Sequence, residues 1–170
     1  YLGINVDTGQ IMPPDEFITL YGKNQLTTRL DTTFAFRDEE TKNICTALED
    51  NDLIIIQGKA GTGKTRLALE CCERFTKNNE RYKTLCILSR GPDIFDDLRV
   101  YFSEPGFFLI LLDDANRASK FEYIVQLLQY QRGNQRIKVI ATVRNYAAEK
   151  ILKECQTYKS PTVIKIQPLT

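Results

Sequence analysis

Short apolar segments and longer amphipathic segments alternate along most of the chain. Runs rich in Val, Ile, Leu and Phe predict strands over 53–57, 84–89, 107–112, 137–142 and 162–166. Apolar residues three or four positions apart predict helices over 38–50, 64–78 and 146–157, one after Gly91-Pro92, and one begun by the capping box of Ser119 and Glu122. Strands that alternate with helices are typical of βαβ units. We therefore expect an α/β fold with a five-stranded, mostly parallel sheet and helices on both faces.

The first 33 residues lack this periodicity. Pro13-Pro14 is a turn signal there, and a polar turn is also expected over 132–135. We therefore divide the chain into an irregular N-terminal segment or linker, residues 1–33, and one α/β domain, residues 34–170. Since the sequence begins at Tyr1 rather than Met and ends abruptly at Thr170, we expect it to be part of a longer protein.

A glycine-rich octapeptide joins the first predicted strand to the helix that follows it. It reads Gly58-Lys59-Ala60-Gly61-Thr62-Gly63-Lys64-Thr65 and matches the phosphate-loop pattern G-x-x-x-x-G-K-[ST]. The glycines let successive amide groups face one concavity, and the helix N-terminus adds a partial positive charge. We expect Lys64 to reach the β- and γ-phosphates and the Thr65 hydroxyl to bind Mg²⁺. Arg66, the next residue, is included among the nucleotide-binding residues; a glycine-rich turn without a ligand is the alternative.

Two acidic residues follow the uninterrupted apolar strand predicted over 107–112. Asp113 and Asp114 stand at its carboxyl end, the edge of an open α/β sheet at which ligands bind. We expect Asp113 to be the second protein ligand of Mg²⁺, and Asp114 to orient or deprotonate the attacking water. The alternative is that the two residues only cap or turn the chain.

The strand predicted over 137–142 also ends in polar residues. Thr142 and Arg144 are candidates to contact the γ-phosphate or the attacking water, because a guanidinium fork matches phosphate oxygens. A solvated arginine at the end of a strand is the alternative for Arg144.

Composition excludes several classes of protein. The net charge is +1, which gives no strong signal for nucleic acid or membrane surfaces, and the longest apolar run, 107–112, is far shorter than the roughly 20 residues of a membrane span. Histidine is absent, which excludes Ser-His and Cys-His catalysis and histidine-ligated metals. Five cysteines without a C-x-x-C pair indicate buried thiols in a reducing compartment, so we expect a cytoplasmic protein.

The missing motifs also narrow the choice of nucleotide. The sequence has no N-K-x-D string for guanine, and Asp113 is not followed by the D-x-x-G pattern of Ras-like GTPases. The segment between Arg117 and Arg136 predicts an amphipathic helix rather than the arginine-rich lid of small-molecule kinases. ATP and ADP are therefore the expected nucleotides.

Taken together, these segments resemble the STAND-type P-loop NTPases, the class of signal-transducing ATPases that includes the NACHT and NB-ARC domains. Gly58–Thr65 resembles the Walker A motif of this class, Leu109–Asp114 its Walker B motif with two acids, and Ala141–Arg144 its sensor strand. Ile166–Thr170 is similar to the exit from the last strand. The resemblance covers about residues 34–170.

A further segment of the resemblance lies ahead of the phosphate loop. Phe34–Glu40 is similar to the hydrophobic-Gly-Arg-Glu-x-Glu segment of the class, with Phe36 in place of Gly and Asp38 in place of Glu. The resemblance implies that Phe36 and Arg37 contact the base of the nucleotide.

The same resemblance implies an ATPase that works as a molecular switch in signalling or in an immune or defence response. ADP holds a closed form, a signal frees it, and ATP supports assembly into an oligomer. The implied partners are nucleotide, further copies of the full-length protein, an unidentified sensor ligand and an effector domain. The strand over 137–142 is implied to lie between those over 53–57 and 107–112, and the isolated chain is expected to hydrolyse ATP slowly.

Two other functions remain open. One is a motor or loader ATPase of the AAA+ type that acts on nucleic acid or protein. Asp113-Asp114 in place of Asp-Glu, and Arg144 on the sensor strand, favour the STAND switch over this alternative. The other is a catalytically inactive nucleotide-binding module, against which the intact Lys64, Thr65 and Asp113 argue.

Overall fold

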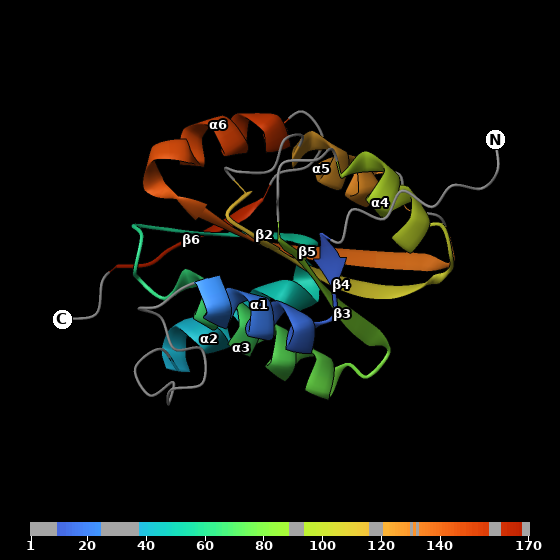
Figure 1. The fold of residues 1–170 in the computed structure, drawn as a ribbon, viewed down its shortest axis with the longest axis horizontal. Helices are drawn as coiled ribbons and strands as arrows, with labels where there is room; N and C mark the ends of the chain where they lie inside the picture. Colours follow the sequence, from blue (N-terminus) through green and yellow to red (C-terminus); the bar gives the residue numbers. More distant parts are fainter. Residues whose placement is uncertain are drawn as a thin grey trace.

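A six-stranded sheet with helices on both faces forms the fold (Figure 1). The computed structural model describes residues 10–24, 38–88, 94–115, 121–129, 131, 133–156 and 161–167. The strands are β1 (Ile11–Met12), β2 (Leu53–Gly58), β3 (Tyr82–Leu88), β4 (Gly106–Asp113), β5 (Gln135–Arg144) and β6 (Thr162–Lys165). The helices are α1 (Pro14–Asn24), α2 (Asp38–Asp50), α3 (Lys64–Asn78), α4 (Phe95–Tyr101), α5 (Phe121–Gln129) and α6 (Asn145–Gln156). None of the helices in the described ranges is long and apolar enough to cross a membrane.

The order of the strands brings the predicted site residues to one edge of the sheet. The order is β1-β3-β4-β5-β2-β6, in which β1 is antiparallel to β3 and all other neighbours are parallel. This confirms the expected mostly parallel sheet and places β5 between β2 and β4. Gly58 is opposite Arg144, and Leu112 is opposite Ala141. The carboxyl ends of β2, β4 and β5 therefore lie side by side.

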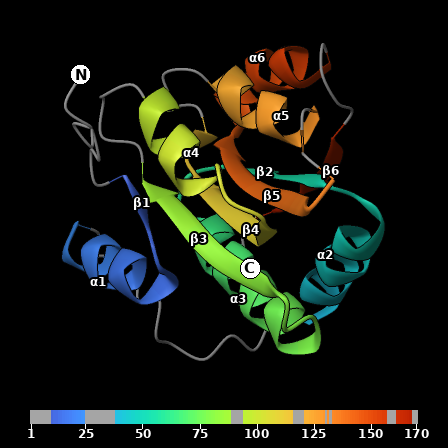
Figure 2. The same ribbon diagram turned by 90° about the vertical axis from the view of Figure 1, so that its right-hand side faces the viewer.

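Each face of the sheet is buried under its own layer of helices, as Figures 1 and 2 show. In β4, Ile110 and Leu112 pack in the core beneath α4, α5 and α6, whereas Leu109 and Leu111 pack in the core beneath α1, α2 and α3. Side chains of a strand alternate between faces, and both faces of this strand are covered. This explains why β4 is apolar at every position from 107 to 112 rather than at every second one.

The N-terminal segment corrects one expectation, because part of it is regular. Residues 11–12 form an edge strand, and Phe17 of α1 is fully buried. A strand of two residues is too short to give a readable period in the sequence. Pro14, taken as part of a turn, is the first residue of α1, where the missing amide hydrogen of proline costs no helical hydrogen bond.

The start of β5 corrects a second expectation. Gln135, predicted to close a polar turn, begins the strand and is 4% exposed. Its side-chain amide donates hydrogen bonds to the carbonyl oxygens of Phe102, at 2.7 Å, and Glu104, at 2.8 Å. These bonds satisfy the buried amide, so a polar residue belongs to the strand. The predicted helix signals at Gly91-Pro92 and Ser119 lie outside the described residues.

The cysteines are free thiols, and Cys71, Cys72, Cys86 and Cys155 are buried while Cys45 is half-buried. Burial raises the pKa of the Cys86 thiol to about 12 and does the same for Cys155. These side chains therefore act as small apolar groups in the core.

A buried lysine fastens α2 to the amino end of the sheet. Lys138 of β5 is 7% exposed, and its ammonium group donates hydrogen bonds to the carbonyl oxygens of Leu48 and, at 3.2 Å, Asn51. It also lies 3.4 Å from the Asp52 carboxylate. A cation at this position satisfies carbonyl groups at the C-terminus of the helix and complements its dipole.

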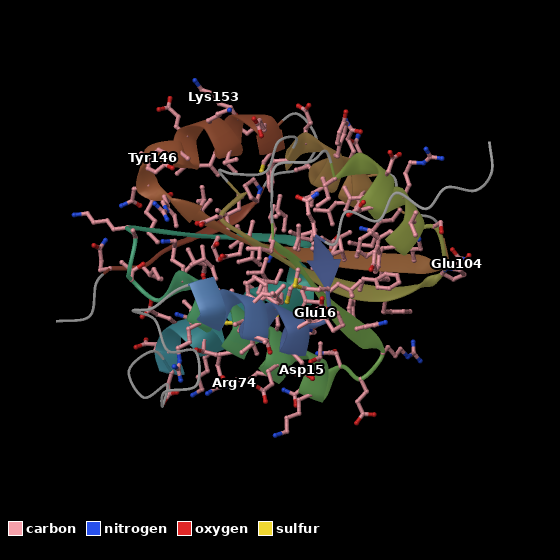
Figure 3. The ribbon with its side chains drawn as sticks, in the orientation of Figure 1. Asp15, Glu16, Arg74, Glu104, Tyr146 and Lys153 are labelled. Atoms are coloured by element: carbon pink, nitrogen blue, oxygen red, sulfur yellow. The ribbon has the colours of Figure 1, made fainter. Side chains whose placement is uncertain are left out.

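Lys138→Met should therefore destabilise the protein. The substitution keeps much of the volume but leaves the carbonyl groups of Leu48 and Asn51 without their donor, so the free energy of unfolding should fall by about 1–3 kcal/mol. Urea denaturation measures the change. Lys153→Met, at an exposed position on α6 (Figure 3), is the matched control and should shift stability by less than about 0.5 kcal/mol. Equal stability of the two variants would show that Lys138 does not fasten α2.

Candidate functional site

The predicted phosphate loop joins β2 to α3 at the edge where the strands end. Gly61 and Gly63 have φ angles of 78° and 85°, in the left-handed region that favours glycine. The Thr62 hydroxyl and the Lys64 ammonium group both donate to the carbonyl oxygen of Lys59, each at 2.8 Å. The loop is therefore closed around one carbonyl group. Lys59, Ala60 and Gly61 form its exposed rim, whereas Lys64 and Thr65 are buried at its base.

The first residue of the loop packs tightly against the end of β6. A side chain at Gly58 would meet the Thr62 hydroxyl at 2.9 Å and the side chain and carbonyl oxygen of Ile166 at 3.0 and 3.1 Å. The Ile166 amide donates to the carbonyl oxygen of Gln57 at 2.8 Å. The loop and the chain that leaves β6 are thus in direct contact, and the sequence motif alone did not point to Ile166.

Asp113 is the centre of a hydrogen-bond network that joins three predicted site residues. Its carboxylate is 4% exposed, and one oxygen, Oδ1, accepts hydrogen bonds from the hydroxyl groups of Thr65, at 2.6 Å, and Thr142, at 2.9 Å. The Thr142 hydroxyl in turn accepts a hydrogen bond from the Asp114 amide at 2.8 Å. Because a carboxylate only accepts, the direction of each bond is fixed. The network connects α3, β4 and β5.

The charges of the site are poorly solvated. Burial raises the pKa of the Asp113 carboxyl group, and the nearby Asp114 raises it further; the Thr65 and Thr142 hydroxyls and Lys64 lower it. Burial also disfavours the charged form of Lys64 and so lowers the pKa of its ammonium group, whereas the nearby Asp114 and Asp113 raise it. A buried charge with incomplete compensation favours a ligand that supplies the opposite charge. Here that ligand would bring a cation to Asp113 and an anion to Lys64.

Asp114 and Arg144 meet beside this network. The Arg144 Nε atom lies 3.7 Å from the Asp114 carboxylate, and the two side chains are 34% and 24% exposed. Asp114 has a φ of 49°, the one positive φ of a non-glycine residue in the part of the chain that the structure describes. Such backbone strain clusters at functional sites. All five residues predicted to act on the phosphates therefore lie in one cluster: Lys64, Asp113, Asp114, Thr142 and Arg144.

Of the three remaining predicted site residues, the structure describes Arg66 alone. Phe36 and Arg37 are outside the described residues. Arg66 lines a separate groove between α1 and α3, whose other lining residues include Ile18 and Tyr82.

The donor set fits Mg²⁺. Thr65 and Asp113 present a hydroxyl and a carboxylate oxygen 2.6 Å apart at the base of the phosphate loop. Mg²⁺ prefers oxygen ligands and is usually held by one or two protein groups together with substrate phosphates and water. No group of three or more Cys, Asp and Glu side chains that could hold a metal occurs among the described residues.

Comparison with known proteins agrees with this geometry. A model of the family described as "Novel STAND NTPase 3" matches residues 36–169. The Aeropyrum pernix Orc1 protein in complex with DNA has a similar fold, with TM-score 0.62, 12% identity, and coverage of 85% of this chain and 48% of Orc1. The Thermotoga maritima RuvB Holliday junction branch migration motor has TM-score 0.51, 18% identity, and coverage of 76% of this chain and 45% of RuvB. A closed state of Hsp104 with ATPγS and FITC casein has TM-score 0.59, 13% identity, and coverage of 95% of this chain and 30% of Hsp104.

At these identities the structural likeness shows the fold alone, which is that of a P-loop NTPase. The chain spans less than half of the length of each of these three proteins. No curated protein sequence matches it.

Thr142→Val tests the network directly, because it keeps the shape of the side chain and removes the hydroxyl. Asp113 then loses a donor and the Asp114 amide loses its acceptor, so the free energy of unfolding should fall by about 1–3 kcal/mol in urea denaturation of the nucleotide-free protein. Thr19→Val is the matched control, since its hydroxyl donates to the carbonyl oxygen of Asp15 at an exposed site. If both variants unfold at the same urea concentration, the network does not stabilise the site.

Proposed function

The chain belongs to the novel STAND NTPase 3 family, and we propose that it is the ATP-binding and ATP-hydrolysing core of a molecular switch. Membership of the family gives a nucleotide-binding P-loop NTPase core. The proposal adds three things: ATP as the nucleotide, control of self-association by the nucleotide state, and a role in signalling or defence. The observation that carries it is the single Asp113 oxygen that binds both the phosphate-loop threonine and the sensor-strand threonine.

The phosphate loop and its neighbours divide the work of binding. Amide groups of Gly58–Thr65 and the Lys64 ammonium group bind the β- and γ-phosphates. To do so, Lys64 exchanges its hydrogen bond to the Lys59 carbonyl oxygen for one to phosphate. Thr65 and Asp113 hold Mg²⁺, which when bound supplies positive charge to the phosphate oxygens. Phe36 and Arg37 contact the base, and Arg66 belongs to the nucleotide-binding segment.

The second acid and the sensor residues carry the hydrolysis. Water attacks the γ-phosphorus, the bond to the bridging β–γ oxygen breaks, and Asp114 orients the water and accepts its proton. Arg144 stabilises the charge on the γ-phosphoryl oxygens. Arg144 is paired with Asp114 in this structure, so both groups must leave that pair before they can act. Thr142 holds Asp113 and the backbone of Asp114 in position.

A switch requires that ATP and ADP have different affinities for two conformations. The contact of Gly58 with Ile166 supports a path for this difference, because a movement of Gly58 would press on the chain that leaves β6. Turnover by the isolated chain should be slow. In P-loop enzymes an added arginine can contribute roughly 10³–10⁵ in rate, and a second copy of the full-length protein is the proposed source of such groups.

A second candidate function is a motor or loader ATPase that acts on nucleic acid or protein. The names of the similar structures favour it, since Orc1 was solved with DNA and RuvB is a branch migration motor. The net charge of +1 does not favour a nucleic-acid partner. ATP hydrolysis that rises strongly on addition of DNA would favour this second function.

Two substitutions should separate binding from hydrolysis. Lys64→Ala removes the buried cation of the loop, so the affinity for Mg²⁺-ATP in isothermal titration calorimetry should fall by roughly 10–100-fold. Lys59→Ala, whose side chain is exposed on the same loop, is the matched control and should bind ATP like the wild type. Asp114→Asn should still bind ATP but hydrolyse it about 10²–10⁴-fold more slowly in single-turnover assays.

Each outcome bears on one part of the proposal. Equal affinities of wild type and Lys64→Ala would contradict the phosphate-loop assignment. Hydrolysis by Asp114→Asn at the wild-type rate would show that Asp114 takes no part in the reaction. The switch itself is tested by light scattering of the full-length protein, which should show a larger mass with ATP than with ADP; equal masses would exclude control of self-association.

A further inference from the structure

A groove of about 580 Å³ lies beside the outer edge of β3. It is lined by α1, by α3 and by residues Tyr82–Thr84 of β3. In Figure 2 this edge of the sheet faces the viewer, with α1 beside it and α3 behind it. The predicted nucleotide-binding residues of the phosphate loop do not line the groove apart from Arg66, so its occupant need not be nucleotide.

Half of the outer edge of β3 has no neighbouring strand within the described part of the chain. On the inner side, β4 pairs with β3 from Tyr82 to Leu88. On the outer side, β1 pairs only with Cys86 and Ile87, and the carbonyl oxygen of Gln10 accepts a hydrogen bond from the Leu88 amide at 2.9 Å. Residues 82–85 therefore have a strand on one side only.

The backbone of Thr84 points into this open edge. Backbone groups of successive residues in a strand point to opposite sides, so the amide and carbonyl of Thr84 face the same side as those of Leu88. The chain cannot continue β1 along this edge. Pro14, which would come opposite Thr84 in the register of β1, has no amide hydrogen to donate, and α1 begins at this residue. β1 thus ends two residue pairs short of Thr84.

We propose that an extended segment of a partner protein binds in this groove as an added strand beside residues 82–85. Its backbone would exchange hydrogen bonds with Thr84 and continue the line of β1. Addition of a strand to an open sheet edge is a recurring mode of peptide recognition, in which the main chain supplies affinity and alternate side chains supply specificity.

The side chains around the groove define the chemistry of the segment. Ile18 of α1 is apolar yet 40% exposed, and Leu69 of α3 lines the opposite wall, so an apolar side chain fits between them. The carboxylates are Asp15, Glu73 and Glu70, of which Glu70 is paired with Arg74 at 3.0 Å, and the cations are Arg66 and Lys83. Glu73 is exposed. It lines the groove together with Tyr82, because α3 runs back along the sheet toward the start of β3. Apart from the Glu70–Arg74 pair, two carboxylates thus face two cations, so the segment should carry apolar residues at alternate positions and little net charge.

The test uses a phage-displayed library of random linear dodecapeptides, selected on the full chain. Synthetic copies of the enriched peptides are then titrated against four proteins by fluorescence anisotropy. Thr84→Pro removes the edge amide, a change that an edge strand tolerates, and Ile18→Asp changes only the apolar wall. Val100→Asp is the matched control, because Val100 is 49% exposed on α4 at the other face of the sheet. Binding of ATP by every variant verifies that it is folded.

We expect enriched peptides with alternating apolar residues and little net charge. Thr84→Pro and Ile18→Asp should each bind them about tenfold more weakly than the wild type, and Val100→Asp should bind them equally well. The Thr84 amide should exchange hydrogen more slowly when peptide is bound. The proposal is overturned if no peptide is enriched, if enriched peptides lack alternating apolar residues, or if they bind Thr84→Pro and Ile18→Asp as tightly as the wild type. Dimerisation of the chain that Ile18→Asp abolishes would also overturn it, since a second copy would then be the occupant.

Discussion

The bond between the buried Asp113 carboxylate and two threonine hydroxyls is the interaction on which the rest of the site depends. Thr65 comes from the first turn of α3 and Thr142 from β5, so one oxygen atom connects the phosphate loop to both strands beside it. This is possible because β5 lies between β2 and β4. Were β5 not next to β4, Thr142 could not reach Asp113, and the Asp114 amide would lose its acceptor.

The same interaction leaves the nucleotide-free protein under electrostatic stress. Because burial raises the pKa of Asp113, its charged form opposes folding. The free energy of unfolding falls as the pH rises from the unfolded-state pKa through the folded-state pKa. Lys64 is also held below its usual pKa. A magnesium-bound polyphosphate would relieve both groups, so its binding would stabilise the folded protein.

Sequence patterns predicted the parts of the fold that repeat or bear a motif, and missed the parts that depend on single contacts. The phosphate loop and the alternation of β2 to β6 with helices follow from glycine spacing and apolar periodicity. β1 has only two residues and no period, and Gln135 belongs to a strand because of hydrogen bonds to distant carbonyls. The site residues were predicted, but not the ion pair of Asp114 with Arg144, which depends on a left-handed backbone that the sequence does not show.

The affinity of ADP with and without Mg²⁺, measured by calorimetry for wild type and Asp113→Asn, tests the central role of Asp113 most directly. Asparagine keeps an oxygen that accepts from Thr65 and Thr142 but removes the charge. The account predicts that Mg²⁺ strengthens binding by about tenfold or more in the wild type and much less in Asp113→Asn, while the two bind metal-free ADP alike. If Asp113→Asn retains the full effect of Mg²⁺, the buried carboxylate is not what holds the metal.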